Sequence, residues 1–310
     1  MHAGPCAPRV AFTGTVMSAP GLRILAPAKV NLHLSVGPAR PDGYHDLTTV
    51  FQALAFGDTV TITDDGSASF RCTPDIGLTA EQNLAHRAAR AMSERFERPV
   101  GYSIAIEKRI PAGAGLGGAS TDAAAVVEGL ATLWGISPSD PAVTDVARSL
   151  GADVPFFFEG GAALFTGRGD VLDRRLMPLD APVVLVKPQT PVNTAEAYVT
   201  FDALAPAEGP SPDRLADALQ ARDPAAVAAA LFNNMTSAAV ALVPEVGVAL
   251  DLVRGGAGVL GAAVAGSGSS VFGICASRDA AARVADAARE AGFWARVTAA
   301  SDHGCVLERA

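Results

Sequence analysis

The residues best suited to chemistry form a glycine-rich run from Pro111 to Asp122, which reads PAGAGLGGASTD. Glycines lack a Cβ, so successive backbone N–H groups can turn toward one point, and a following helix adds unpaired amides and the positive end of its dipole. This combination binds phosphate. The alternative is a turn that only caps a helix, but four glycines in the six residues 113–118 cost backbone entropy that a simple cap does not require.

The run departs from the commonest nucleotide-binding loops. Ala119 stands where a P-loop has its lysine. Gly113, Gly115 and Gly118 satisfy GxGxxG, but no strand ending in an acidic residue follows about 20 residues later to hold a ribose. The HRD and DFG sequences of protein kinases are also absent from the chain. A Walker-type NTPase and a protein kinase are therefore excluded, and a dinucleotide-binding dehydrogenase is disfavoured.

A second candidate is Asp153, which is followed by Val154, Pro155 and three phenylalanines. A carboxylate buried in such surroundings requires a cation or hydrogen bonds. Lys29 is the obvious partner, and Asn31 would project from the same face of a strand because side chains alternate with period two. The alternatives are that Asp153 caps a turn after Gly151 and that Lys29 and Asn31 face water.

The segment PAGAGLGGASTDAA resembles the phosphate loop of the GHMP small-molecule kinases. Two other segments agree: APAKVNLHL at 26–34 with RPDGYH at 40–45, and AGSGSSVF at 265–272. PAKVNLHL with PDGYH is most similar to members that act on a cytidine diphosphate-linked sugar alcohol. The resemblance implies ATP-dependent phosphorylation of the 2-hydroxyl of 4-diphosphocytidyl-2-C-methylerythritol, in non-mevalonate isoprenoid biosynthesis. The alternatives are another GHMP kinase, such as a homoserine kinase-like enzyme, and a non-catalytic ligand-sensing relative.

The resemblance also implies roles for individual residues. Asp153 would accept the hydroxyl proton and Lys29 would keep it ionised. The implied substrate contacts are Asn31, Tyr44, His45, Thr194 and Tyr198, with Tyr44, His45 and Tyr198 around the cytosine ring. The implied ATP contacts are Pro111, Ala112, Gly113, Ala114, Gly115, Leu116, Gly117, Gly118, Ala119, Ser120 and Thr121, with Asn83 and Lys108 near the adenine. The implied supporting loop is Gly266, Ser267, Gly268 and Ser269.

Several of these residues have a second interpretation. Ser120 and Thr121 could cap the helix, the loop at 266–270 could be a plain hairpin turn, and Tyr198 could belong to the core. ATP and Mg²⁺ are the expected cofactors. We expect Mg²⁺ to arrive with ATP rather than in a dedicated protein cage, and the Ser120 hydroxyl is the candidate protein ligand. The segment Asn233-Asn234-Met235-Thr236 differs from the family pattern, and its role is open.

Hydropathy patterns predict the elements that position these residues. Strands are expected in 22–54 on either side of a loop at 38–43, a strand pair at 58–63 and 67–72, a helix at 83–96 and a strand at 102–110. A helix should open at Ser120, with another at 141–150 and strands at 162–166 and 183–186. Further on, helices are expected near 213–232, 245–254 and 279–291, and strands at 260–265, 271–276 and 294–299.

We therefore predict an α+β protein with domains at 22–180 and 181–310, preceded by a disordered extension at 1–21 that is poor as a signal peptide. The resemblance implies that the first domain is like ribosomal protein S5 domain 2 and the second is ferredoxin-like. The 310 residues carry 24 basic and 32 acidic side chains, and this net charge of -8 argues against a nucleic acid or membrane partner. We expect a cytoplasmic monomer or weak homodimer.

Overall fold

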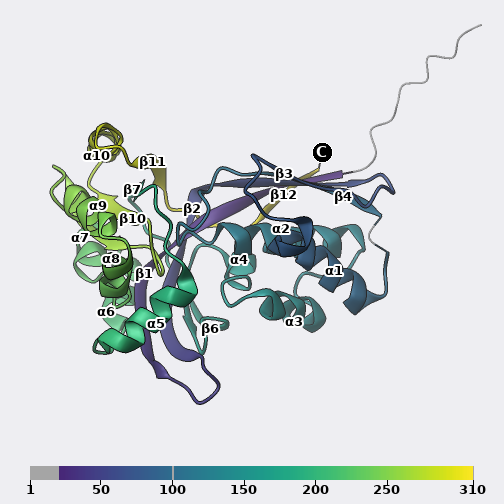
Figure 1. The fold of residues 1–310 in the computed structure, drawn as a ribbon, viewed down its shortest axis with the longest axis horizontal. Helices are drawn as coiled ribbons and strands as arrows, with labels where there is room; N and C mark the ends of the chain where they lie inside the picture. Colours follow the sequence, from purple (N-terminus) through teal and green to yellow (C-terminus); the bar gives the residue numbers. More distant parts are fainter. Residues whose placement is uncertain (1–20, 100, 310) are drawn as a thin grey trace, which may run out of the picture.

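The computed structural model describes residues 21–99 and 101–309. The predicted extension at 1–21 therefore lies outside the described residues, except for Gly21, which begins the first strand. Figure 1 shows two lobes side by side, joined by the long strands β1 (Gly21–Ala39) and β2 (His45–Asp64), which run from one lobe to the other. Within the described ranges, no helix combines the length and the apolar character needed to cross a membrane.

The first sheet has eight strands and carries Lys29 and Asn31 on β1. Its main order is β12-β1-β2-β4-β3; β5 pairs with β2 and β6, and β8 pairs with β1. The additional strands are β3 (Phe70–Thr73), β4 (Tyr102–Glu107), β5 (Ala162–Thr166), β6 (Val171–Leu176), β8 (Phe232–Asn233) and β12 (Val306–Arg309).

The predicted strand pair at 58–63 and 67–72 is wrong. Residues 58–63 are the end of β2, which already has β1 on one side and β4 on the other. Since both edges of β2 are occupied there, β3 joins the far side of β4 and runs parallel to it. The choice of sheet neighbour is a long-range property that the local turn residues do not determine.

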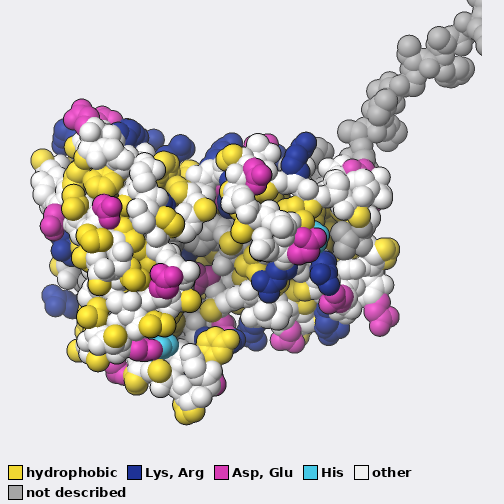
Figure 2. All heavy atoms as spheres, in the orientation of Figure 1, with side chains coloured by type: hydrophobic (Ala, Val, Ile, Leu, Met, Phe, Trp, Pro, Cys, Tyr) yellow, Lys and Arg dark blue, Asp and Glu magenta, His cyan; other side chains and the backbone are white. Residues whose placement is uncertain are grey.

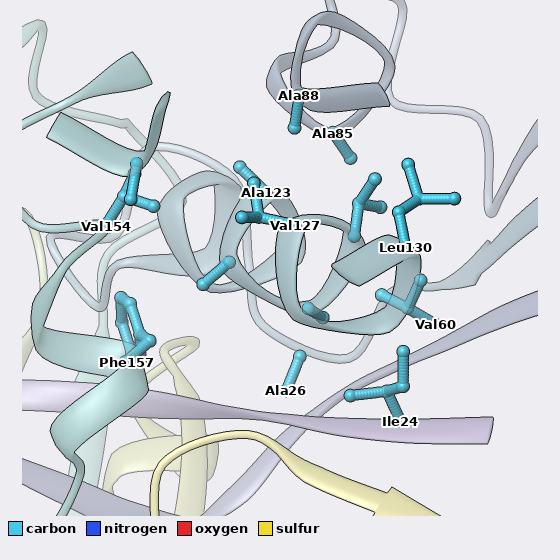
Figure 3. Packing of buried hydrophobic residues seen from close by; sticks show 14 of the residues in the cluster. Ile24, Ala26, Val60, Ala85, Ala88, Ala123, Val127, Leu130, Val154 and Phe157 are labelled. Atoms are coloured by element: carbon cyan, nitrogen blue, oxygen red, sulfur yellow. The ribbon is translucent and has the colours of Figure 1, made fainter. Parts of the chain in front are cut away.

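Helices cover one face of this sheet. They are η1 (Ala80–Gln82), α1 (Leu84–Phe96), α2 (Gly118–Leu133), α3 (Pro141–Leu150) and α4 (Phe156–Glu159). Figure 3 shows α2 between α1 and the strands, with Ala123 and Val127 at the centre of the packing. Small side chains allow this close approach: a Cβ on Gly129 would lie 2.6 Å from the Ile62 Cδ1 atom. The sheet thereby fixes the helix that begins at the glycine run.

The second lobe is built on a four-stranded antiparallel sheet of order β11-β7-β10-β9. Its strands are β7 (Pro182–Lys187), β9 (Val259–Val264), β10 (Val271–Cys275) and β11 (Trp294–Ala299). Its helices are α5 (Thr194–Leu204), α6 (Asp213–Gln220), α7 (Pro224–Ala229), α8 (Thr236–Leu242), α9 (Glu245–Arg254) and α10 (Arg278–Glu290).

Two expectations for this lobe need correction. The predicted helix at 213–232 is divided, because Asp223 caps a new helix whose first residue is Pro224, and proline has no N–H for the preceding helix. Helix α5 was not expected at all. The predicted boundary near residue 180 stays a prediction: β7 begins at Pro182, but β8 and β12 return to the first sheet.

Candidate functional site

A cleft of about 430 Å³ contains most of the predicted site residues. Figure 2 shows the surface hollowed between the two lobes. Its walls come from β1, from the whole run 110–120, from the start of α5 and from the loop between β9 and β10. Asp153, the turn at Arg168–Gly169, strand β2 and the segment 76–84 also contribute to the lining.

The glycine run forms a tight loop that leads directly into α2. Gly113, Gly115 and Gly117 have φ angles of +60°, +73° and +75°, a region that side chains with a Cβ rarely adopt. A Cβ on Gly115 would lie 2.1 Å from the Ala265 carbonyl oxygen, so the loop also presses against the other lobe. Among the described residues, no backbone N–H of 113–117 donates a hydrogen bond to protein. The loop therefore offers free amide donors at a helix start, as an anion site requires.

Ser120 and Thr121 do not cap α2. The helix begins at Gly118 after an N-cap at Gly117, so both hydroxyls lie within the first turn. Ser120 lines the cleft. Thr121 is completely buried, with its Oγ1 atom 4.0 Å from the Cys305 Sγ atom, so the structure does not bring it to the cleft. Of the two predicted hydroxyl contacts, Ser120 alone is placed to meet a phosphate or a metal ion.

Lys29 and Asp153 meet at the centre of the cleft. The Lys29 Nζ atom lies 3.2 Å from the Asp153 Oδ2 atom and donates a hydrogen bond of 2.9 Å to Asn31 Oδ1. Asn31 in turn donates to the Thr49 hydroxyl at 2.8 Å, so strand β1 presents Lys29 and Asn31 on one face, as predicted. The Lys29 side chain is 4% exposed and Asp153 is 32% exposed. Asp153 is thus less buried than the sequence suggested, and it opens to the cleft.

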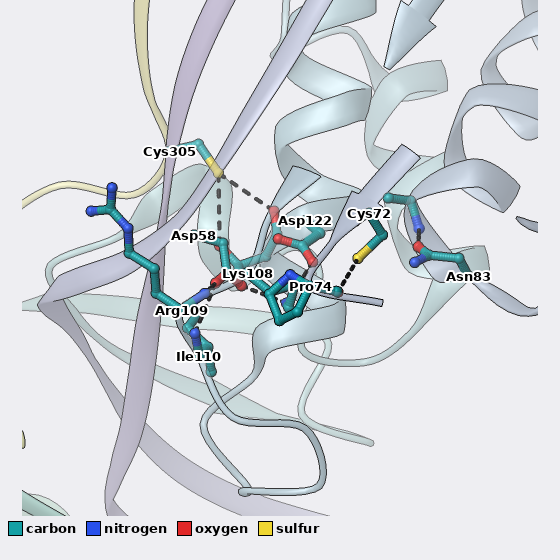
Figure 4. A network of polar contacts seen from close by, with 11 residues as sticks. Asp58, Cys72, Pro74, Asn83, Lys108, Arg109, Ile110, Asp122 and Cys305 are labelled. Carbon is teal, nitrogen blue, oxygen red and sulfur yellow. Dashed lines mark hydrogen bonds and ion pairs between the residues drawn. The ribbon is translucent and has the colours of Figure 1, made fainter. Parts of the chain in front are cut away.

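Lys108 is held by a buried cluster that the sequence analysis missed. Its Nζ atom donates to Asp58 at 2.5 Å and to Asp122 at 2.7 Å, and Asp58 also accepts the backbone N–H groups of Arg109 and Ile110. Figure 4 shows these groups converging from β2, the end of β4 and the first turn of α2. The cluster joins the two ends of the glycine run. The sequence offered one signal for this cluster, because Asp58 is an isolated acidic residue within a strand.

The electrostatics of this cluster follow from burial. Desolvation raises the pKa of Asp122 to about 7 in spite of the opposing effect of the Lys108 ammonium. Burial alone would lower the pKa of Lys108, but Asp122 and Asp58 together raise it. The Asn83 side chain also has a structural partner, because it caps α1 by accepting a hydrogen bond from the Ala85 N–H at 3.0 Å. Lys108 and Asn83 therefore shape the cleft wall that they line.

The residues predicted to bind the cytosine ring lie near the end of the cleft opposite Asn83 and Lys108. The rings of His45 and Tyr198 are 5.1 Å apart, and His45 Nδ1 donates to the Gly37 carbonyl oxygen at 2.9 Å. Burial, followed by the nearby Asp153 charge, raises the pKa of Tyr198 to about 12. Of these residues only Tyr198 lines the cleft; His45 is buried behind it, and Tyr44 is 54% exposed, so both lie outside the lining. The Arg168 guanidinium covers the Tyr44 ring at 5.0 Å, and the sequence analysis missed this arginine.

The loop between β9 and β10 is both a hairpin connection and a wall of the cleft. Gly266 and Ser267 line the cleft, and the Ser267 and Thr194 hydroxyls are 3.2 Å apart. Gly268 is outside the lining, and Ser269 is fully buried. The Asn233 side chain donates to the carbonyl oxygens of Val264 and Gly266, each at 2.8 Å, which gives this unassigned asparagine a structural role.

The acidic residues do not form a ready metal cage. Within the part of the chain that the structure describes, no cluster of three or more His, Cys, Asp or Glu side chains could hold a metal ion. The cleft carboxylates are Asp122, which is bound to Lys108, and Asp153, which is bound to Lys29. The Ser120 hydroxyl, at the start of α2, lines the same cleft.

Comparison with known proteins agrees with this geometry. Residues 83–161 match the family model "GHMP kinases N terminal domain", and residues 215–293 match "GHMP kinases C terminal". The chain is 36% identical to the 4-diphosphocytidyl-2-C-methyl-D-erythritol kinase of Exiguobacterium sibiricum, over 84% of this chain and 91% of that one. It is 39% identical to the same-named kinase of Nocardia farcinica, over 90% and 92% of the two chains.

Solved structures give the same result. A crystal structure of 4-(cytidine 5'-diphospho)-2C-methyl-D-erythritol kinase matches with a TM-score of 0.75 and 35% identity, covering 90% of this chain and 99% of that one. A homoserine kinase from Cytophaga hutchinsonii matches with a TM-score of 0.69 and 19% identity, covering 96% and 100% of the two chains. The second match shows a shared two-domain fold alone.

Proposed function

The chain belongs to the GHMP kinase family, and from this premise we propose that it transfers the γ-phosphate of ATP to the 2-hydroxyl of 4-diphosphocytidyl-2-C-methyl-D-erythritol, in non-mevalonate isoprenoid biosynthesis. The observation that carries the proposal is the Lys29–Asp153 pair, which lies in the same cleft as the glycine loop. A carboxylate beside a loop of free amides supports this proposal, because phosphoryl transfer to an alcohol needs a proton acceptor close to the bound phosphates.

Asp153 serves as the general base. The Lys29 ammonium lies 3.2 Å from the Asp153 carboxylate, and the partial exposure of Asp153 leaves an oxygen accessible to an acceptor hydroxyl. Lys29 also stabilises the negative charge that develops during transfer. Asn31 holds Lys29 in place through its Oδ1 atom and lines the cleft, where it can orient the acceptor alcohol.

ATP is held mainly by backbone groups. The free amides of 113–117 and the first turn of α2 receive its phosphates. Mg²⁺ fits a cleft of this kind when the nucleotide phosphates supply most of its ligands, and Ser120 is the residue that would add a protein oxygen. When bound, Mg²⁺ neutralises charge on the transferred phosphoryl group. Asn83 and Lys108 shape the end of the cleft that receives the adenine of ATP in this proposal.

The cytidine end of the acceptor is received near β2 and α5. His45 and Tyr198 are already in contact, and Thr194 reaches the cleft beside Ser267. Tyr44, fixed beneath Arg168, offers a second aromatic face. The proposed acceptor is a small molecule. A cytoplasmic location and a monomeric or weakly dimeric state stay predictions.

The direct test is ADP formation by the purified full-length chain with ATP, Mg²⁺ and the cytidyl acceptor. We expect turnover that depends on this acceptor, while homoserine and mevalonate at the same concentration give only background. Turnover of homoserine without turnover of the cytidyl acceptor would show that the chain is a different kinase of this family. Saturable cytidine nucleotide binding without ADP release would point to a ligand-sensing protein.

A further inference from the structure

A second cavity, of about 410 Å³, lies on the side of α2 that faces α3 and α4. It shares no lining residue with the catalytic cleft. Its walls are the end of α3 and the loop before it, the segment Pro155–Glu159, and strands β5 and β6. The function proposed above uses none of these side chains.

Glu128 projects from α2 into the lining of this cavity. The residue is 7% exposed, its Oε2 atom is fully buried, and no hydrogen bond from another described residue reaches its carboxyl group. Burial, followed by the charge of Glu159, raises the pKa of Glu128 to about 8. A buried carboxyl group without a partner is costly, and it calls for a ligand, an ion or a proton.

Each of the other acids in the cavity wall has an arginine partner. Glu159 forms an ion pair with Arg175, and Asp170 forms one with Arg168 at 3.0 Å. Arg148 is exposed at the edge and forms no ion pair with another described residue. Glu128 is therefore the uncompensated acid of the cavity. The remaining wall includes apolar surface from Pro138, Pro155, Phe158, Phe165 and Leu172.

We propose that this cavity binds a small organic molecule with a primary ammonium group and an apolar body, and that the Glu128 carboxylate receives the ammonium. An ammonium group has three N–H donors, whereas the Glu128 carboxylate accepts no hydrogen bond from another described residue. A hydrogen bond between the two groups would be charge-assisted. An inorganic metal ion fits less well, because the described residues supply no group of three acidic, His or Cys ligands here and the volume far exceeds that of one ion. The apolar wall matches a hydrocarbon body.

The probe is phenethylamine, with 2-phenylethanol as its neutral counterpart, and binding is measured by calorimetry at about pH 8.5 on the full chain without nucleotide. We expect saturable binding of the amine and at least about tenfold weaker binding of the alcohol. Glu128→Gln should weaken amine binding about tenfold or more, because it keeps the shape but removes the charge. Glu94→Gln, at an exposed glutamate on α1, is the matched control and should bind like wild type.

A pH series provides an independent measurement if Glu128→Gln folds poorly. The titratable groups that interact with Glu128 are Glu159 on α4 and the Cys305 thiol before β12. The other charged side chains of the cavity wall are Arg148 on α3, Asp170 before β6 and Arg175 on β6. Because the amine needs ionised Glu128, its binding should weaken at least about tenfold between about pH 8.5 and about pH 6. No saturable amine binding, equal binding of the alcohol, or unchanged affinity in Glu128→Gln would overturn the proposal. Kinase activity is a separate measurement, so the two proposals can fail independently.

Discussion

The Lys29 Nζ atom lies 3.2 Å from the Asp153 Oδ2 atom, although 123 residues separate them in the chain. Lys29 comes from β1, and Asp153 comes from the turn between α3 and α4. The Lys29 backbone N–H also donates to the Leu116 carbonyl oxygen at 3.0 Å, so the ion pair and the glycine loop are joined directly. Lys29 therefore links Asp153 to the glycine loop through one ion pair and one backbone hydrogen bond.

Replacing Lys29 tests its electrostatic role. Lys29→Met should lower kcat about 100-fold or more, because the ammonium no longer stabilises the transition state. The melting temperature should change little, since Asp153 is 32% exposed and water can solvate it. Steady-state kinetics and thermal unfolding measure the two effects. Arg23→Met, at an exposed ion pair with Glu308, is the control and should keep wild-type kcat; an equal loss there would refute a specific role for Lys29.

The buried cluster around Lys108 should govern ATP affinity and stability together. Asp58→Asn leaves Lys108 with one carboxylate and is expected to lower the free energy of unfolding by about 3 kcal/mol, because Asp58 is fully buried. Since Asp58 also holds the start of the glycine run, KM for ATP should rise while KM for the acceptor stays near wild type.

Urea unfolding and two-substrate kinetics test the Asp58 prediction. Glu94→Gln, which removes an exposed pair with Arg90, should cost less than about 0.5 kcal/mol. An Asp58→Asn protein with both KM values changed equally would show a general structural defect rather than an effect on the nucleotide loop.

Substitutions at two glycines can distinguish the cost of a steric clash from the cost of backbone strain. Gly115 and Gly135 have nearly equal φ angles of +73° and +69°, but a Cβ would meet the Ala265 carbonyl oxygen at 2.1 Å in the first and nothing within 4 Å in the second. Gly135→Ala should therefore cost about 1 kcal/mol of strain. Gly115→Ala should cost about 3 kcal/mol or more and abolish measurable ATP binding. Comparable costs in urea unfolding would contradict the close packing of the loop.

The stability of the protein should depend on pH through Glu128. Its pKa is raised from 4.5 to about 8 in the folded state, so the folded state binds the proton more tightly. The contribution of this proton to the free energy of unfolding is fully present below pH 4.5 and is lost as pH rises through about 8. Glu128→Gln should therefore gain stability relative to wild type as pH rises across this window. A constant difference in unfolding free energy from pH 4.5 to about 8 would contradict the shift.

Local sequence patterns predicted the parts of the site that depend on local geometry. Lys29 and Asn31 share a strand face because of the period of two, and the glycine run precedes a helix as its composition indicates. The pairing of Asp153 with Lys29 followed from the cost of burying a carboxylate. The partial exposure of Asp153 was not predictable, because it depends on how the lobes leave the cleft open.

Features that depend on distant contacts were missed. Asp58 and Asp122 reach Lys108 from different elements, and no local spacing indicates that they meet. The placement of β3 beside β4 depends on which sheet edge was free. Helix α5 was missed because its apolar residues are distributed around the helix, with Phe201 buried but Val199 71% exposed.

The most direct test of the account is Asp153→Asn, with the exposed Asp145→Asn on α3 as its control. The account predicts that acceptor-dependent ADP formation falls about 1000-fold in Asp153→Asn while the dissociation constant for ATP stays within about threefold of wild type. Asp145→Asn should match wild type in both. Wild-type turnover by Asp153→Asn would contradict the assignment of this carboxylate as the base.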